Sequence, residues 1–166
     1  MSAATALLDD APYGVQYLRG RIRDEFPLAR HIGIEVEYAA DERLVLSAPF
    51  EPNANHNGTA FGGSQFCIAV LAGWAWVTRY LAAHQIPADA VVQESTIQYL
   101  APVQGALRAS LRTPPVEHIE KFRKMLLKAG RGRIRLHVDI HYGRSVATQF
   151  DGTFVAAVRP QPATAS

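Results

Sequence analysis

The feature that most limits how this chain can fold is a long apolar stretch, residues 62–83. It contains no proline, it is rich in alanine and leucine, and its polar residues lie near its two ends, so it predicts a helix. A helix that is apolar on all sides is buried. Its apolar run, Phe66–Val77, is shorter than the roughly 20 residues of a membrane span. We therefore expect no membrane span, and a buried helix that the rest of the chain wraps.

Length and composition exclude several classes of protein. The chain has 166 residues, which fits one domain, and we predict a single domain over residues 1–166 with frayed ends at 1–11 and 160–166. A net charge of +2 gives no global signal for nucleic acid. One cysteine and six scattered histidines predict no disulfide framework, no metal site and no cofactor. The N-terminus does not have the pattern of a signal peptide, so we expect a cytoplasmic protein.

Hydrophobic patterns divide the rest of the chain into short elements. A helix is predicted at residues 12–25, and an amphipathic helix, or a long excursion with helical character, at 116–128. Alternating or β-rich runs predict strands at 32–38, 43–49, 90–100, 106–113, 131–142 and 145–158. Most connections are short, so the sheet should be mainly antiparallel. One long apolar helix against one such sheet predicts an α+β fold.

The loop before the apolar helix, residues 53–64, is rich in asparagine and glycine. The first turn of a helix has unpaired N–H groups and a partial positive charge. Gly62 and Gly63 have no Cβ, so another molecule's oxygen can come close to their backbone. This arrangement suits an anion, or a carbonyl oxygen that becomes negative during a reaction. The alternative is a glycine pair that serves only close helix–sheet packing.

Two motifs resemble a known family. Asn55, Gly58, Phe61, Gly62 and Gly63 align with the N-x-x-G-x-x-H-G-G pattern of hotdog-fold thioesterases, and Thr96–Pro102 followed by Gly105 aligns with their next strand. Pro52–Ser64 also matches the P-N-x-N-H-x-G/E-T-x-F-G-G-S pattern of thioesterases similar to the YiiD C-terminal domain. The resemblance covers about residues 27–158. It implies a hotdog fold, in which a curled antiparallel sheet wraps a central helix, and a thioester bound at a homodimer interface.

The same resemblance implies a reaction but not its base. In the family the thioester carbonyl points at the N-terminus of the helix, and a carboxylate on that helix acts as general base or nucleophile, nine residues after the histidine. Here Phe61 stands at the position of the histidine and Val70 at that of the carboxylate. Another group must therefore activate the water.

Four residues are our candidates for catalysis: Asn55, His56, Gly63 and Glu94. Gly63, with Gly62, would donate N–H groups to the oxyanion. The resemblance gives Asn55 a role in binding substrate or orienting water; the alternative is a left-handed turn residue. His56 is the side chain of the loop that can take a proton near pH 7, unless it is a surface histidine. Glu94 could replace the missing carboxylate, or be an ion-paired strand residue.

Candidates for substrate binding lie in the same loop, the first helical turn and the next strand: Asn57, Gly62, Ser64, Gln65, Ser95 and Thr96. Strand alternation places Glu94 and Thr96 on one face and Ser95 on the other. In the family this strand reaches the partner's site. Cys67 is expected to be a small core residue rather than a nucleophile. The two tryptophans of the helix are expected in the core or in the lining of an acyl tunnel.

A basic cluster follows later in the chain: Lys121, Arg123, Lys124, Lys128, Arg131, Arg133 and Arg135. It could meet the phosphates of coenzyme A, with Arg131 and Arg133 as contact candidates, or an acidic acyl carrier protein. The alternative is a solvated helix face. No aromatic stacking pattern accompanies the charges, so nucleic acid is not expected.

The expected protein is thus a homodimeric hydrolase of acyl-CoA or acyl-carrier-protein thioesters in fatty acid metabolism. Whether dimers stack into a tetramer is left open. One alternative is a non-catalytic hotdog protein that binds acyl thioesters. Another is a hotdog dehydratase or hydratase, although its motif of a histidine with an acidic residue has no convincing copy here.

Overall fold

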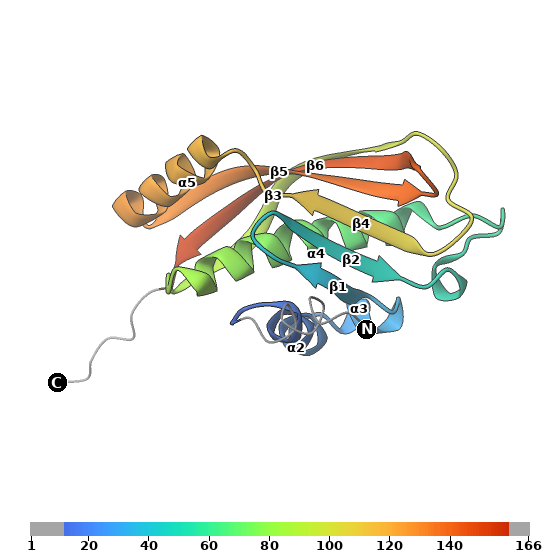
Figure 1. Ribbon diagram of the computed structural model, residues 1–166, viewed down its shortest axis with the longest axis horizontal. Helices are drawn as coiled ribbons and strands as arrows, with labels where there is room; N and C mark the ends of the chain where they lie inside the picture. Colours follow the sequence, from blue (N-terminus) through green and yellow to red (C-terminus); the bar gives the residue numbers. More distant parts are fainter. Residues whose placement is uncertain (1–11, 160–166) are drawn as a thin grey trace.

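A computed structural model describes residues 12–159, and one helix, α4 (Gly62–Ala83), runs along the concave side of a curled sheet (Figure 1). The predicted bounds of this helix are confirmed. The sheet has six strands in the order β1-β2-β4-β5-β6-β3, and each neighbouring pair is antiparallel. The strands are β1 (Glu35–Ala39), β2 (Arg43–Ala48), β3 (Ala88–Tyr99), β4 (Leu107–Arg112), β5 (Arg131–Tyr142) and β6 (Ser145–Val158). This wrapped-helix α+β arrangement is the hotdog fold that the sequence predicted.

Three further helices and one short turn complete the described chain. They are α2 (Val15–Glu25), α3 (Pro27–His31), the 3-10 turn η1 (Glu51–Asn53) and α5 (Val116–Ala129). Helix α2 packs against β1 and α4, whereas α5 packs against β5. The amphipathic pattern of 116–128 is a helix, as predicted, and it buries Phe122 and Leu126. The frayed ends expected at 1–11 and 160–166 lie outside the described residues.

The segment between α2 and β1 differs from the prediction. Pro27 does not simply end the first helix but starts a second one, α3, because the fixed φ of proline suits the first helical position. Ile32 caps α3, and Gly33 turns the chain with φ of +70°. The strand therefore starts at Glu35 rather than Ile32. The first helix likewise starts at Val15, after Tyr13 with its positive φ.

Burial of α4 explains its composition. Thirteen of its 22 residues are buried, and at Gly73 the helix lies so close to the sheet that a Cβ would come within 2.2 Å of the Phe154 ring. By length and composition α4 could cross a membrane, but most of it is covered by the fold. The core helix of a wrapped domain passes the same test, so the length of α4 is weak evidence for a membrane span.

Strand β3 forms one edge of the sheet, because it pairs with β6 and has no second neighbour among the described strands. Its register places Ser95, Ile97 and Tyr99 opposite Gly152, Phe150 and Thr148, on the face toward α4. Most of its residues from Val91 onward are exposed. A twelve-residue edge with apolar side chains is a surface that another strand can pair with.

Candidate functional site

The N-terminus of α4 is open. Within residues 12–159 the backbone N–H groups of Gly62, Gly63 and Ser64 have no hydrogen-bond acceptor, and Phe61, the N-cap residue, supplies no side-chain cap. Gly63 is exposed and Gly62 is half-buried. Three unpaired donors at the positive end of a 22-residue helix form a site that favours a negatively charged or strongly polarised oxygen.

Two aromatic rings flank these donors. The Phe61 ring lies over Gly63, where an added Cβ would come within 2.3 Å of it, and the Tyr99 ring lies against Gly62. The Tyr99 hydroxyl donates to the Gly62 carbonyl at 2.9 Å, and burial raises the pKa of Tyr99 above its usual value, so the phenol stays protonated. Tyr99 was not among the predicted site residues. Its position in the Thr96–Pro102 strand motif could have pointed to it, but that motif was used only to predict the fold.

A shallow cavity of about 310 Å³ lies beside this helix end. It is bordered by Thr59, Ala60, Gly62, Gln65, Tyr99, Leu100, Ala101 and Pro102. None of these described residues carries a carboxylate. The site therefore offers hydrogen-bond donors and apolar walls, but no acidic side chain from its own chain.

Asn53 anchors the loop in front of α4. Its side chain is fully buried and donates to the carbonyls of Ile32 and Pro49, at 2.8 and 2.7 Å. The backbone carbonyl of Asn53 accepts the Phe61 N–H at 2.7 Å. Asn53 thus fixes where α4 begins. Its place in the Pro-Asn motif was the signal for this role.

Of the three loop side chains predicted to act in the site, one is hydrogen-bonded within the loop and two are exposed to solvent. Asn55 Oδ1 accepts the Asn57 N–H at 2.8 Å and its Nδ2 donates to the Thr59 hydroxyl at 2.9 Å, so Asn55 closes the turn with its own side chain. The left-handed residue is Gly58, not Asn55. His56 and Asn57 are exposed at the tip, and the His56 side chain has no hydrogen bond within residues 12–159. The roles predicted for these three residues stay predictions.

Gln65 is buried, and both its amide nitrogen and its amide oxygen are hydrogen-bonded. Its Nε2 donates to the Ala60 carbonyl at 3.0 Å, and its Oε1 accepts the Thr148 hydroxyl. The amide thus ties the loop, α4 and β6 together beside the open helix end. Ser64, the third residue of α4, is also buried, with 7% exposed. Both lie where the sequence placed them, and Gln65 uses its Oε1 and one of its two Nε2 hydrogens within the fold.

The strand candidates lie on opposite faces of the sheet, as alternation predicted. Glu94 and Thr96 pair with Thr153 and Asp151 on the face turned away from α4. The Thr153 hydroxyl donates to Glu94 at 3.4 Å, and Glu94 makes no ion pair within residues 12–159. Ser95 faces α4. Within one chain, Glu94 and the open end of α4 are separated by the sheet itself.

The phosphate candidates are also distant from α4's first turn. Arg131 and Arg133 are exposed on β5, opposite Ala157 and Val155 of β6. Gln65 marks the helix end and bonds Thr148, seven residues before Val155, which is about 23 Å along a strand. Arg133 donates to Gln93 at 2.8 Å. Their role toward a phosphate stays a prediction.

Metal and thiol chemistry have little support in the described residues. Within residues 12–159 no group of three or more His, Cys, Asp or Glu side chains could hold a metal ion. Cys67 is half-buried on α4, and burial raises the pKa of its thiol. The thiol therefore stays protonated near neutral pH, as expected for a core residue.

A family model described as "Putative thioesterase (yiiD_Cterm)" matches residues 15–158. The chain belongs to this family. The match spans every helix and strand of the fold. Membership of the YiiD C-terminal family agrees with the hotdog architecture.

Solved structures agree with the family. A protein of unknown function from Chlorobaculum tepidum TLS is 30% identical with a TM-score of 0.84, and the alignment covers 87% of this chain and 94% of that one. A "putative thioesterase" from Shewanella oneidensis is 29% identical with a TM-score of 0.77, covering 87% and 97%. A "probable thioesterase" from Pseudomonas aeruginosa, 18% identical with a TM-score of 0.72 over 87% and 95%, shows the fold alone.

Proposed function

We propose that this member of the YiiD C-terminal family hydrolyses acyl thioesters of coenzyme A or of an acyl carrier protein. The observation that carries the proposal is the open end of α4, with unpaired N–H groups at Gly62, Gly63 and Ser64. A thioester carbonyl that points there gains negative charge as water attacks. Donors that are already oriented stabilise that charge without reorganising.

The site is completed by a second copy of the chain, in a homodimer paired through β3. Val91, Val92 and Tyr99 leave 60%, 38% and 51% of their surface exposed on this edge strand. Phe66, which is 38% exposed on α4, packs edge-to-face against Phe150, the residue opposite Ile97 of β3. Pairing of two β3 edges would bury these side chains and satisfy the free strand edge.

His56 is the proton acceptor in this proposal. It is exposed, its side chain has no hydrogen bond within residues 12–159, and it lies in the loop that leads into α4. Imidazole is the side chain best suited to take a proton from water near neutral pH. Glu94 faces the other side of the sheet and is not assigned this role.

Hydrolysis is tested with a panel of acyl-CoA and acyl-carrier-protein substrates of increasing chain length, with release of the thiol as the readout. We expect turnover above the enzyme-free rate, at least tenfold higher for some chain lengths than for others, because the walls beside α4 are apolar. A folded dimer without turnover on any member would reject the enzyme.

The pH dependence tests the base. Wild-type kcat/KM should fall toward acid pH, because a protonated imidazole cannot accept a proton. His56→Gln should lower kcat about 100-fold and remove that acid limb. His31→Gln, on α3, is the matched control and should leave the profile unchanged. If the pH profile of kcat/KM in His56→Gln is the same as in the wild type, another group accepts the proton from water.

A second candidate is a non-catalytic acyl-thioester binder. It is favoured by one observation: Phe61 and Val70 stand where the family resemblance places a histidine and a carboxylate, and no carboxylate borders the cavity among the described residues. This candidate predicts saturable binding of acyl-CoA in calorimetry with no turnover in the panel. It also predicts that His56→Gln leaves the affinity unchanged.

A further inference from the structure

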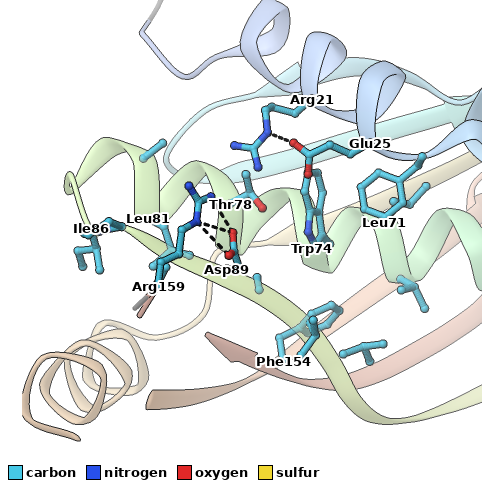
Figure 2. A pocket seen from close by; sticks show the side chains of 18 of the residues that line it. Arg21, Glu25, Leu71, Trp74, Thr78, Leu81, Ile86, Asp89, Phe154 and Arg159 are labelled. Carbon is cyan, nitrogen blue, oxygen red and sulfur yellow. Dashed lines mark hydrogen bonds and ion pairs between the residues drawn. The ribbon is translucent and has the colours of Figure 1, made fainter. Parts of the chain in front are cut away.

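A second cavity lies along the other half of α4, between α2, α4 and the start of β3 (Figure 2). Its volume is about 660 Å³, within the range of sites that bind small molecules. On α4 its lining runs from Val70 to Ala82, about 18 Å at the rise of a helix. A groove of this length suits an extended chain rather than a single ring. We call it the α2–α4 groove.

The floor of the α2–α4 groove is apolar, and its charges cancel. Leu71, Trp74, Leu81, Ile86 and Phe154 supply hydrocarbon and aromatic surface (Figure 2). Four charged side chains line the groove in two ion pairs, Arg21 with Glu25 and Arg159 with Asp89. These two positive and two negative charges sum to zero, so the groove does not favour a ligand of either sign. The part of a ligand inside the groove therefore carries no net charge, and its hydrocarbon portion contacts this floor.

Two polar groups in this apolar wall have no partner. Thr78 is 6% exposed, and its hydroxyl makes no hydrogen bond within residues 12–159. The indole N–H of Trp74, which is 8% exposed, likewise has no acceptor in this range. The two residues are four apart on α4, and Figure 2 shows them side by side facing α2. Both residues line the groove and their polar atoms are accessible from it, so a ligand that displaces water from the groove has to supply a hydrogen-bonding oxygen of its own there.

We propose that the α2–α4 groove binds the acyl chain of the substrate, and that this chain carries a hydroxyl or oxo oxygen held by Thr78 and Trp74. The inference rests on the proposed function, which supplies the thioester. Thr78 can donate or accept and Trp74 can donate, so the two match an uncharged oxygen. The surrounding hydrocarbon surface then binds the rest of the chain.

The topology places the groove where an acyl chain can reach it. The groove lies at the start of β3, lined by Ala88–Val92, whereas the open end of α4 lies at the end of β3, beside Tyr99. Antiparallel pairing of two β3 edges sets the start of one strand beside the end of the other. The thioester held at one subunit's α4 therefore directs its acyl chain toward the partner's groove.

Binding can be measured without turnover by using amide analogues. The probes are the amide isosteres of N-acetylcysteamine thioesters, which are neutral, with a plain dodecanoyl chain or with a hydroxyl on carbon 3, 8 or 12. In calorimetry on the dimer, at least one hydroxylated probe should bind about five- to tenfold more tightly than the plain probe, the gain of one buried hydrogen bond.

Substitutions at Thr78 test whether its hydroxyl binds the oxygen of the acyl chain. Thr78→Val replaces the hydroxyl by a methyl group and should abolish the preference while leaving affinity for the plain probe unchanged. Thr78→Ser keeps the hydroxyl and should keep the preference. If every hydroxylated probe binds no better than the plain one, or if the preference survives Thr78→Val, the assignment is wrong.

Blocking the groove tests its location. Ala82→Phe places a ring into the groove and should weaken every probe at least tenfold. Ala83→Phe puts the same ring on the next, exposed position of α4, outside the groove lining, and should change nothing. Unchanged binding in folded Ala82→Phe would place the chain elsewhere. A protein that binds the hydroxylated probe but hydrolyses no thioester would support the groove and reject the hydrolase.

Discussion

At the scale of single residues, Gly63 has the clearest link to function. Its missing Cβ leaves room for the Phe61 ring, and in the proposed function an acyl oxygen approaches its backbone N–H. In Gly63→Ala the exposed Phe61 ring can swing aside, and alanine favours the helix, so unfolding free energy should change by less than about 1 kcal/mol. The methyl group blocks the N–H donors, so kcat/KM should fall about tenfold or more.

The control for this variant is Gly20→Ala in α2, where an added Cβ meets nothing within 4 Å. Thioester turnover and chemical denaturation are measured for both proteins. Wild-type turnover in Gly63→Ala would show that the oxygen does not approach this backbone.

Gln65 shows how a buried amide fixes the helix end. Gln65→Leu keeps the volume but leaves the Thr148 hydroxyl and the Ala60 carbonyl without their partner. It should lower the unfolding free energy by about 1–3 kcal/mol. Adding Thr148→Val removes one of the two orphaned groups, so the double variant should recover part of the loss. Urea denaturation of the four proteins of the cycle measures this, and strictly additive losses would contradict the coupling.

At the scale of elements, α2 and α4 respond oppositely to the same substitution. Gly73→Ala in α4 would place a methyl group within 2.2 Å of the buried Phe154 ring, and should destabilise the fold by about 1–3 kcal/mol. Gly20→Ala in α2 faces open space and should stabilise by up to about 1 kcal/mol. Thermal unfolding of both variants gives the comparison. Equal effects would mean that helix propensity, not packing against the sheet, sets the cost at Gly73.

At the scale of the whole molecule, the β3 edge determines whether the proposed site is complete. Val91→Lys places a charge on this edge, where a second copy would have to bury it, and should weaken dimerisation at least tenfold. Val116→Lys, on exposed α5, is the control and should leave the assembly unchanged. Sedimentation equilibrium measures both. A Val91→Lys protein with wild-type assembly would place the interface elsewhere.

Sequence by itself determined the elements of this protein. Periodicity is a local property, so the bounds of α4, β5 and β6 could be read directly, and the glycines at the start of α4 marked its open end. The missed helix α3 shows the limit of local reading, because Pro27 can end one helix or start the next.

Tertiary structure alone decided which side chains meet. The Asn55 amide is used within its own loop, Glu94 faces away from α4, and Arg131 lies near the far end of the sheet. For Trp74 the sequence left open the core or an acyl tunnel, and only the placement of α2 and β3 put it with Thr78 in the lining of the α2–α4 groove. Each of these outcomes depends on contacts between residues far apart in the chain, which no local pattern encodes.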